Sequence, residues 1–358
     1  MEATSRRDVL KLLGLGAAAA FRNPPSALAR PAKDAPKSKP IEGSWISILW
    51  DDRRHHYWND ACARFTAEQW DYAVREVSEI GMRYLVLLAV AKGGRAFYDT
   101  PLLPKAKELV CGNPIEALLA AADKYGVRFF LSCDWYGPWH GAATLNRPEA
   151  VRPRLQMMAE IAERYAHHKS FFGWYWANEA YLTPYFVPAF VEYINTCSRE
   201  ARLLTPKAKT LTAPYYTHKA VCDDRFVKQL QGLDVDIIAY QDEVGCLRMT
   251  PNESAKAFAK LRAAHDKVPQ RALWADVETF AWEGEPNRQE SPLIPAPFAR
   301  IQRQLEAVGP YVDKVLIYQY QGIMNKPGSK APAGHPNATK LYNDYVRWLK
   351  VNHPEMLR

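Results

Sequence analysis

From residue 43 to the end of the chain, short apolar runs alternate with longer amphipathic stretches, and this repeat constrains the fold more than any other feature. The apolar runs have the length of buried strands, whereas the amphipathic stretches have the length and the cap residues of helices. The predicted strands are Ser44–Leu49, Tyr84–Val90, Arg128–Ser132, Gly173–Ala177, Thr210–Pro214, Ile237–Tyr240, Leu273–Val277 and Val315–Gln319. Repeated strand–helix units at intervals of roughly 30–50 residues predict a (β/α)8 TIM barrel that forms a single domain over residues 43–358.

An open, doubly wound sheet is the alternative arrangement for alternating strands and helices. Such sheets commonly bind nucleotides at a glycine-rich turn, but neither G-x-G-x-x-G nor G-x-x-x-x-G-K-[ST] follows any predicted strand. A length of 358 residues is compatible with two domains, yet no change of composition divides the chain after residue 43. The barrel is therefore the favoured fold.

The first 29 residues have the composition of an export signal rather than of a folded domain. Ser5–Lys11 (SRRDVLK) resembles the twin-arginine motif of bacteria, and the apolar stretch Leu12–Phe21 that follows is too short to span a bilayer comfortably. Two alanines before residue 30 fit a cleavage site. We therefore predict a twin-arginine export signal at 1–29, a proline-rich linker at 30–42 and a periplasmic mature protein, delivered by the twin-arginine export machinery.

The net charge of +8 gives no support to nucleic-acid binding. Removal of residues 1–29 lowers it to +6, and the remaining lysines and arginines form no basic run. Beyond the signal, no segment is apolar and long enough to suggest a membrane span, so the mature protein is not expected to be membrane-embedded. The scattered cysteines include no C-x-x-C pair, which argues against a dense disulfide scaffold and a zinc finger. They are Cys62, Cys111, Cys133, Cys197, Cys222 and Cys246.

In a (β/α)8 barrel, functional residues lie in the loops that follow the carboxyl ends of the strands. In this chain, aromatic residues stand beside carboxylates, amides or imidazoles at most of these ends. Aromatic faces stack on sugar rings, and carboxylates and amides hydrogen-bond sugar hydroxyls, so the pattern favours a carbohydrate site over core packing. The candidate substrate-binding residues are Trp50, Asp51, Asp134, Trp135, His140, Trp176, Tyr216, Tyr240, Asp242 and Tyr320.

Two glutamates stand out among the residues at the strand ends. Glu179 follows the fourth predicted strand, and Glu278 follows the seventh. Cleavage of a glycosidic bond needs one carboxyl group that protonates the leaving oxygen and another, ionised, that acts as nucleophile or base. Strands four and seven lie nearly opposite each other in an eight-stranded barrel, so the two side chains can converge on a substrate. Because side chains alternate along a strand, Trp274, Asp276 and Glu278 share one face, and Glu278 points into the mouth if that face is the interior.

The Asn178–Glu179 pair after strand four and Glu278 at the end of strand seven resemble the retaining glycoside hydrolases of the (β/α)8 superfamily called clan A. The resemblance implies that Glu179 is the general acid/base, that Glu278 is the nucleophile and that Asn178 contacts the 2-hydroxyl group of the sugar. It further implies hydrolysis of a poly- or oligosaccharide with retention of configuration. We expect no cofactor and no metal ion.

A narrower resemblance involves the first third of the barrel. Gly43–Trp50, Phe65–Trp70 and Ile80–Met82 are similar to an exported bacterial family that is catalogued as a domain of unknown function with a hydrolase-like barrel. In clan A a tyrosine at strand six often contacts the nucleophile. Tyr240 matches that position, but the acidic Asp242 follows it closely. Asp242 or Asp134 is therefore an alternative to Glu278 as the second carboxylate.

Two other functions share the same residues. A metal-dependent sugar isomerase or epimerase could use histidines and carboxylates at the strand ends, although no H-E-x-x-H pair supports one. A non-catalytic glycan-binding barrel would have the same aromatic lining. A serine hydrolase is disfavoured because no G-x-S-x-G motif occurs. The candidate metal ligands are His55, His56, His140, His218, Asp134, Glu179, Asp242 and Glu278.

Overall fold

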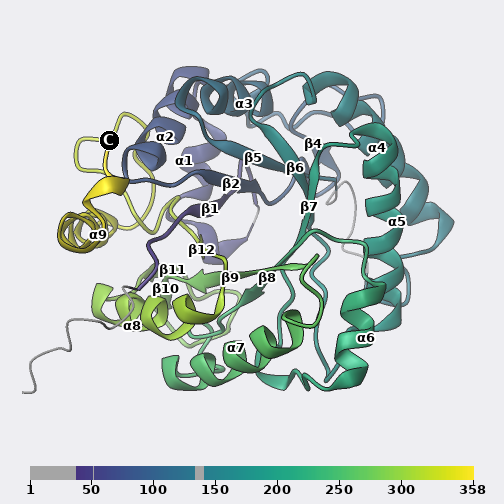
Figure 1. Ribbon diagram of the computed structural model, residues 1–358. Coiled ribbons are helices and arrows are strands. Elements are labelled where there is room, and N and C mark those ends of the chain that lie inside the picture. The colour runs from purple at the N-terminus through teal and green to yellow at the C-terminus, as the bar shows by residue number, and fades with distance from the viewer. Residues whose placement is uncertain (1–37, 51, 134–140) are drawn as a thin grey trace, which may run out of the picture. The chain divides into compact units, whose positions relative to one another are not determined.

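The computed structural model describes residues 38–50, 52–133 and 141–358. Its centre is a closed barrel of eight parallel strands, in which each strand pairs with the next along the chain and the last pairs with the first (Figure 1). The (β/α)8 prediction is confirmed, and the open-sheet alternative is wrong. The barrel strands are β1 (Gly43–Ile46), β2 (Tyr84–Leu87), β5 (Arg128–Ser132), β6 (Phe171–Trp176), β7 (Lys209–Thr212), β8 (Ile237–Gln241), β9 (Ala272–Glu278) and β12 (Lys314–Tyr318).

Helices surround the barrel on its outside (Figure 1). Thr66 and Thr250 begin two of them with capping boxes. The threonine hydroxyl accepts a hydrogen bond from the backbone N–H of Gln69 or Glu253, and the side chain of that residue accepts one from the backbone N–H of the threonine. Gly126 ends a third helix in the left-handed conformation, with φ of 67°. The surrounding helices are α2 (Ala67–Glu79), α3 (Pro114–Tyr125), α4 (Pro148–Tyr165), α5 (Pro188–Leu204), α6 (Asp224–Gly232), α7 (Pro251–His265), α8 (Phe298–Val308) and α9 (Ala338–Asn352).

Additional short elements are inserted after the carboxyl ends of several barrel strands. One insertion is the antiparallel pair β10 (Phe280–Trp282) and β11 (Leu293–Pro295), which follows β9. These insertions give the carboxyl face of the barrel the side chains that a cavity needs. The others are the 3-10 helix η1 (Arg53–His55) and α1 (Asn59–Ala63) after β1, the pair β3 (Ala91–Lys92) and β4 (Arg95–Ala96) after β2, and the 3-10 helix η2 (Thr217–Lys219) after β7.

Alternate side chains of each strand point into the barrel or out toward the helices. On β6, Tyr175 belongs to the apolar cluster inside the barrel. Trp174 and Trp176 belong to the outer core, stack with ring centroids 6.5 Å apart and donate hydrogen bonds to side chains of α5 and of the residue that follows it. The inner cluster consists of Trp45, Tyr84, Val86, Leu88, Phe130, Tyr175, Ala177, Leu211, Ala213, Ile237, Ala239, Trp274 and Leu316.

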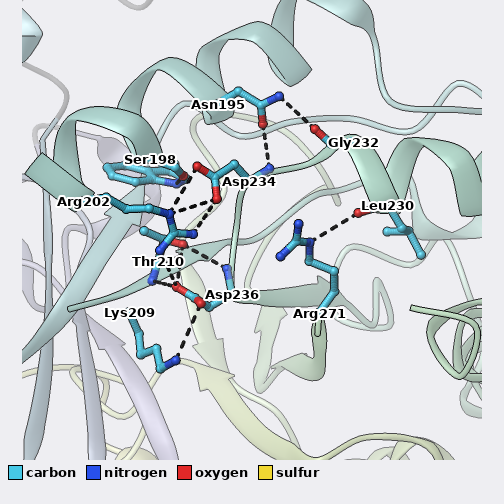
Figure 2. Close-up of polar contacts among 11 residues, drawn as sticks. Asn195, Ser198, Arg202, Lys209, Thr210, Leu230, Gly232, Asp234, Asp236 and Arg271 are labelled. Atoms are coloured by element: carbon cyan, nitrogen blue, oxygen red, sulfur yellow. Dashed lines mark hydrogen bonds and ion pairs between the residues drawn. The ribbon is translucent and has the colours of Figure 1, made fainter. Parts of the chain in front are cut away.

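Charged residues at the amino ends of β7 and β8 form a polar network (Figure 2). The Asp236 carboxylate accepts hydrogen bonds from the backbone N–H of Thr210 at 2.9 Å and from its hydroxyl at 3.0 Å. Arg202 of α5 pairs with Asp234, and the Lys209 ammonium lies 3.6 Å from Asp236. The network lies at the end of the barrel opposite the functional loops, so its role is to join neighbouring strands and helices.

Of the predicted linker at 30–42, the structure describes residues 38–42. Ile41 is fully buried, and its N–H donates a hydrogen bond of 2.9 Å to the hydroxyl of Tyr345 in α9. All six cysteines lie in the described residues and carry free thiols. Within the described ranges, none of the helices has the combination of length and apolar character that a membrane crossing requires. The predicted export signal at 1–29 lies outside the described residues.

Candidate active site

A cavity of about 440 Å³ occupies the carboxyl end of the barrel. Side chains from β1, β6, β8, β9 and β12 and from the loops that follow several strands line it, and Glu179 and Glu278 are among them. The sequence therefore identified two carboxyl groups that do share one site. The aromatic side chains of the lining are Trp45, Trp50, Tyr175, Tyr215, Phe280, Trp282 and Tyr318.

Glu179 lies three residues beyond β6, and its Oε1 accepts a hydrogen bond of 3.1 Å from Nε2 of Gln241 at the end of β8. Burial raises the pKa of Glu179 to about 7, although the Gln241 hydrogen bond and the positive charges of Arg54 and Arg248 oppose this shift. A carboxyl group with this pKa is partly protonated at neutral pH. It can give up and regain a proton there, as an acid/base catalyst must.

Glu278 is the last residue of β9 and is only 5% exposed. Its Oε2 accepts a hydrogen bond of 2.7 Å from the backbone N–H of Cys246. Burial, followed by the negative charge of Asp242, raises the pKa of Glu278 to about 8. The N–H donor orients the carboxyl group and favours its ionised form against these two effects.

The loop after β8 approaches Glu278 so closely that a glycine is required. A Cβ atom at Gly245 would lie 2.7 Å from Cβ and 3.0 Å from Oε2 of Glu278, and 3.1 Å from the Phe280 ring. Real Cβ atoms do not come this near to other atoms. Gly245 therefore allows the N–H of Cys246 to reach the carboxylate.

Asp276 lies one inward position before Glu278 on β9 and also lines the cavity. It is 4% exposed, and its Oδ1 has no hydrogen-bond partner among the described residues. Burial, and then repulsion from Glu278, Asp242 and Glu179, holds the pKa of Asp276 well above its usual range. Neighbouring buried carboxylates repel one another, so each of these groups makes ionisation of the others less favourable.

Asp242 and Glu243 lie behind the cavity wall, where they fix the loops. Asp242 is fully buried and accepts hydrogen bonds from Gln304 Nε2 at 2.7 Å and from the backbone N–H of Glu278 at 3.0 Å, while burial raises its pKa to about 6. Fully buried Glu243 accepts hydrogen bonds from His218 Nδ1 at 2.6 Å and from the backbone N–H of Tyr216 at 2.7 Å. The structure thus places Asp242 beside the backbone of Glu278 rather than in the cavity. Glu243 was not predicted.

Besides Asp242, the predicted binding residues Trp176, Tyr240, Tyr320 and Asn178 are also not among the residues that line the cavity. Trp176 donates its indole hydrogen bond to Ser198 of α5, and the hydroxyl of Tyr240 lies 3.1 Å from Nε2 of His265 in α7. Tyr320 borders a separate cavity of about 30 Å³, which has room for about one water molecule. Asn178 is 3% exposed, and its backbone N–H donates to the hydroxyl of Tyr193.

Of the other predicted binding residues in the described part of the chain, Trp50 lines the cavity, with the Lys92 ammonium 3.7 Å from its ring centroid. Tyr216 is not part of the lining; it is in the left-handed conformation with φ of 62°, beneath the guanidinium of the lining residue Arg248. The remaining predicted residues lie outside the described part of the chain. They are Asp51, Asp134, Trp135 and His140.

Several cavity residues were not predicted. Tyr175 and Gln241 line the cavity, whereas their chain neighbours Trp176 and Tyr240 point outward. The same alternation that placed Asp276 and Glu278 on one face could have identified Tyr175 and Gln241. Nothing in the sequence pattern indicated Arg54 or Arg248, because Arg54 belongs to the short 3-10 helix η1 and Arg248 to the loop after β8, outside the barrel strands.

The histidines proposed as metal ligands have other partners or surroundings. His55 packs on Trp58 with ring centroids 4.8 Å apart, and burial lowers its pKa to about 3, so it is neutral. His218 is bound to Glu243. In the ranges that the structure describes, the group of side chains that could share a metal ion is instead on the outside of the barrel, and it consists of Glu116, His167 and His168.

The fold is found in several proteins of known structure. A candidate alpha-L-fucosidase from Bacteroides thetaiotaomicron superposes with a TM-score of 0.70 at 18% identity, over 91% of this chain and 98% of that one. The endo-beta-1,4-mannanase of Thermotoga petrophila gives a TM-score of 0.55 at 13% identity, over 90% and 79% of the two chains. The endo-1,4-beta-mannanase of Rhizomucor miehei gives 0.55 at 10% identity, over 87% and 95%. At such identities the likeness concerns the fold alone.

Among curated proteins, none matches this chain in sequence. Residues 41–331 match a family described as a domain of unknown function, DUF4434. This match covers most of the barrel and confirms the narrower resemblance inferred from the first third of the sequence. The chain therefore belongs to the DUF4434 family.

Proposed function

We propose that this protein is a glycoside hydrolase that cleaves a poly- or oligosaccharide by a two-carboxylate mechanism. The observation that carries the proposal is that Glu179 and Glu278, from different strands, line one aromatic cavity at the carboxyl end of the barrel. The names of the similar structures, a candidate fucosidase and two mannanases, support the same reaction class. The cavity is also large enough to enclose sugar rings.

In this mechanism Glu179 is the general acid/base. In its protonated form it donates a proton to the glycosidic oxygen, and in its ionised form it later removes a proton from the attacking water. Gln241 holds one carboxyl oxygen of Glu179 by the hydrogen bond to Oε1. Burial raises the pKa of Glu179 to about 7, which keeps a proton available near neutral pH.

Glu278 is the nucleophile. Its carboxylate attacks the anomeric carbon, the glycosidic bond breaks, and the leaving oxygen takes the proton of Glu179. Water then hydrolyses the glycosyl–enzyme ester, so the product retains its anomeric configuration. The Cys246 N–H stabilises the ionised form of Glu278, while burial and repulsion from neighbouring carboxylates hold the pKa of Asp276 well above its usual range. Trp50 and the other aromatic side chains of the lining provide faces for sugar rings.

A panel of poly- and oligosaccharides of different sugars and linkages tests the proposal. We expect cleavage of one class, and proton NMR of the first product should show the anomer of the substrate. Release of the opposite anomer would contradict the retaining mechanism but not the hydrolase. Binding of a glycan without any cleavage would instead support the non-catalytic binding barrel, and activity that a chelator abolishes would support a metal enzyme.

The pH dependence of hydrolysis is expected to be a narrow bell. Burial raises the pKa of Glu179 to about 7 and that of Glu278 to about 8, and in such a cluster the two apparent values belong to the group as a whole. Because the value for Glu278 is the higher, the active form with ionised Glu278 and protonated Glu179 is a minor protonation state, and it is most populated midway between the two values. We expect the maximum of kcat/KM between about pH 7 and pH 8. An optimum near the pKa of exposed carboxyl groups would contradict this prediction.

Gly245→Ala should impair hydrolysis and destabilise the loop after β8, because the added methyl group is forced into a buried contact. The added methyl group must displace Glu278 or the loop that carries the Cys246 N–H, because it would lie 2.7 Å from Glu278 Cβ. A misplacement of about 1 Å can cost about 100-fold in rate, and we expect kcat/KM to fall by that order. Gly112→Ala is the matched control, since no atom lies within 4 Å of a Cβ there. Equal activity of the two variants would show that the position of Glu278 is not critical.

We also propose that the chain is exported to the periplasm by the twin-arginine machinery. The support is the Ser5–Lys11 motif and the apolar stretch that follows it. Cell fractionation of a producing bacterium tests this. The wild type should be processed and periplasmic, whereas replacement of Arg6 and Arg7 by lysine should leave the precursor in the cytoplasm. Periplasmic localisation of both forms would point to another route.

A further inference from the structure

Two arginines line the cavity from separate loops. Arg54 belongs to η1, after β1, and Arg248 follows β8, which is not adjacent to β1 in the barrel. Guanidinium groups bind carboxylates and sulfate-like anions with particular strength, because their N–H donors are charged and arranged in pairs. Two such groups in one cavity suggest a site for an anionic group of the substrate.

Each arginine is held in place but retains donors that the protein does not use. Arg54 donates from Nε and Nη2 to the Asp52 carboxylate, at 3.0 Å and 2.5 Å. Arg248 lies 4.5 Å from the centroid of the Tyr216 ring, and its Nη1 is 3.4 Å from Glu243 Oε1. Among the described residues, Nη1 of Arg54 and the Nε and Nη2 groups of Arg248 donate no hydrogen bond. The side chains are 39% and 35% exposed, so these donors are accessible to a ligand.

The charges in the cavity are arranged unevenly. Arg54 and Arg248 both act on Glu179, the proposed acid/base, whereas the strongest charge effect on Glu278 comes from the carboxylate of Asp242. Arg300 lies near Glu278 but donates to backbone carbonyls and is not part of the lining. In a retaining mechanism the acid/base group stands at the glycosidic oxygen, and so next to the leaving part of the substrate.

We propose that the cavity takes a carbohydrate that carries an anionic group, a carboxylate or a sulfate ester, on the leaving-group side of the scissile bond, and that Arg54 and Arg248 bind this group. The inference rests on the proposed hydrolase function and names its substrate class. Guanidinium groups suit such ligands because their planar N–H pairs match two oxygens of one anion. Asp52, Glu243 and Tyr216 hold the two guanidinium groups in position before the substrate arrives.

The test compares oligosaccharides of one backbone in three forms, namely neutral, oxidised at C6 to uronic acids, and O-sulfated. We expect the wild type to cleave an anionic form with the higher kcat/KM, and added salt to reduce this preference. Arg54→Met and Arg248→Met should lower the preference roughly 10- to 100-fold, as expected for a lost charged hydrogen bond. Arg248→Lys should restore part of it. Arg303→Met, at an exposed position of α8, is the matched control and should leave the preference unchanged.

The ratio of kcat/KM for anionic substrates to kcat/KM for neutral substrates distinguishes binding of the anionic group from indirect effects of the substitutions. A change in the pKa of Glu179 or in loop structure would alter hydrolysis of all three forms alike, so a constant ratio in the arginine variants would overturn the inference while the hydrolase stands. If none of the three forms is cleaved, calorimetry measures instead whether Glu179→Gln binds them, and this binding tests the anion site. Binding of an anionic form that the arginine substitutions abolish would support the anion site without the hydrolase, and absence of such binding would reject the anion site as well.

Discussion

Glu278→Gln is expected to lower kcat by roughly 10⁴- to 10⁶-fold, the range typical of the loss of a catalytic nucleophile. An amide cannot form the glycosyl–enzyme ester, and no other described carboxylate of the cavity is placed to replace it. Asp276 lies one inward position deeper in the barrel, and burial holds its pKa well above its usual range. The amide oxygen of glutamine can still accept the Cys246 N–H, so the fold and the substrate affinity should be preserved. The measurements are kcat on the substrate found in the glycan panel and the unfolding temperature.

Azide provides the control for the role of Glu278. In Glu278→Ala, the anion can enter the space of the lost carboxylate, attack the anomeric carbon and give a glycosyl azide of inverted configuration. In Glu179→Ala, azide can attack only after Glu278 has formed its ester, so the product has retained configuration. If Glu278→Gln kept wild-type activity, Glu278 would be excluded as the nucleophile. Asp134, one of the alternatives predicted from the sequence, would then be the candidate.

Glu179→Gln is expected to lower kcat by about 10² to 10⁴ on substrates with a sugar leaving group, because such a leaving group needs a proton. The loss in rate should be much smaller when Glu278 forms its ester with an aryl glycoside, because the phenolate leaving group does not need a proton. Binding should be little changed, since the amide keeps the shape of the side chain and its contact with Gln241. Single-turnover kinetics with both kinds of substrate measure the difference.

A matched control and a pH profile make the test of Glu179 specific. Glu306→Gln, on the exposed side of α8, removes a carboxylate far from the cavity lining and should leave kcat unchanged. In Glu179→Gln the alkaline limb of the pH profile should disappear, because no acid with a pKa of about 7 remains to be lost. An equal loss for aryl and sugar leaving groups would mean that Glu179 has another role.

Much of the fold could be predicted from the sequence because strand–helix repeats are a local signal. All eight predicted strands overlap the observed ones, and Arg128–Ser132 is identical to β5. Glu179 and Glu278 could be placed at the cavity because both follow directly from strand ends. The alternation of side chains along β9 put Asp276 and Glu278 on the inner face, as the structure has them.

Trp176 and Tyr240 lie near strand ends, as predicted, but they do not line the cavity. Side chains alternate along a strand, so the neighbours Tyr175 and Gln241 face the cavity instead. Tyr320 differs for another reason. It lies beyond the end of β12, where strand geometry no longer dictates the direction of a side chain.

The sequence by itself determined the barrel, the strand ends that carry function and the two glutamates, since each depends on periodicity within a few residues. The tertiary structure alone decided what surrounds the glutamates. The Cys246 N–H on Glu278, the glycine that lets it approach, and Arg54 and Arg248 beside Glu179 come from loops distant in the chain, whose path depends on packing with the whole barrel. The raised pKa values of both glutamates have the same origin, because burial of a carboxyl group is a property of the folded chain.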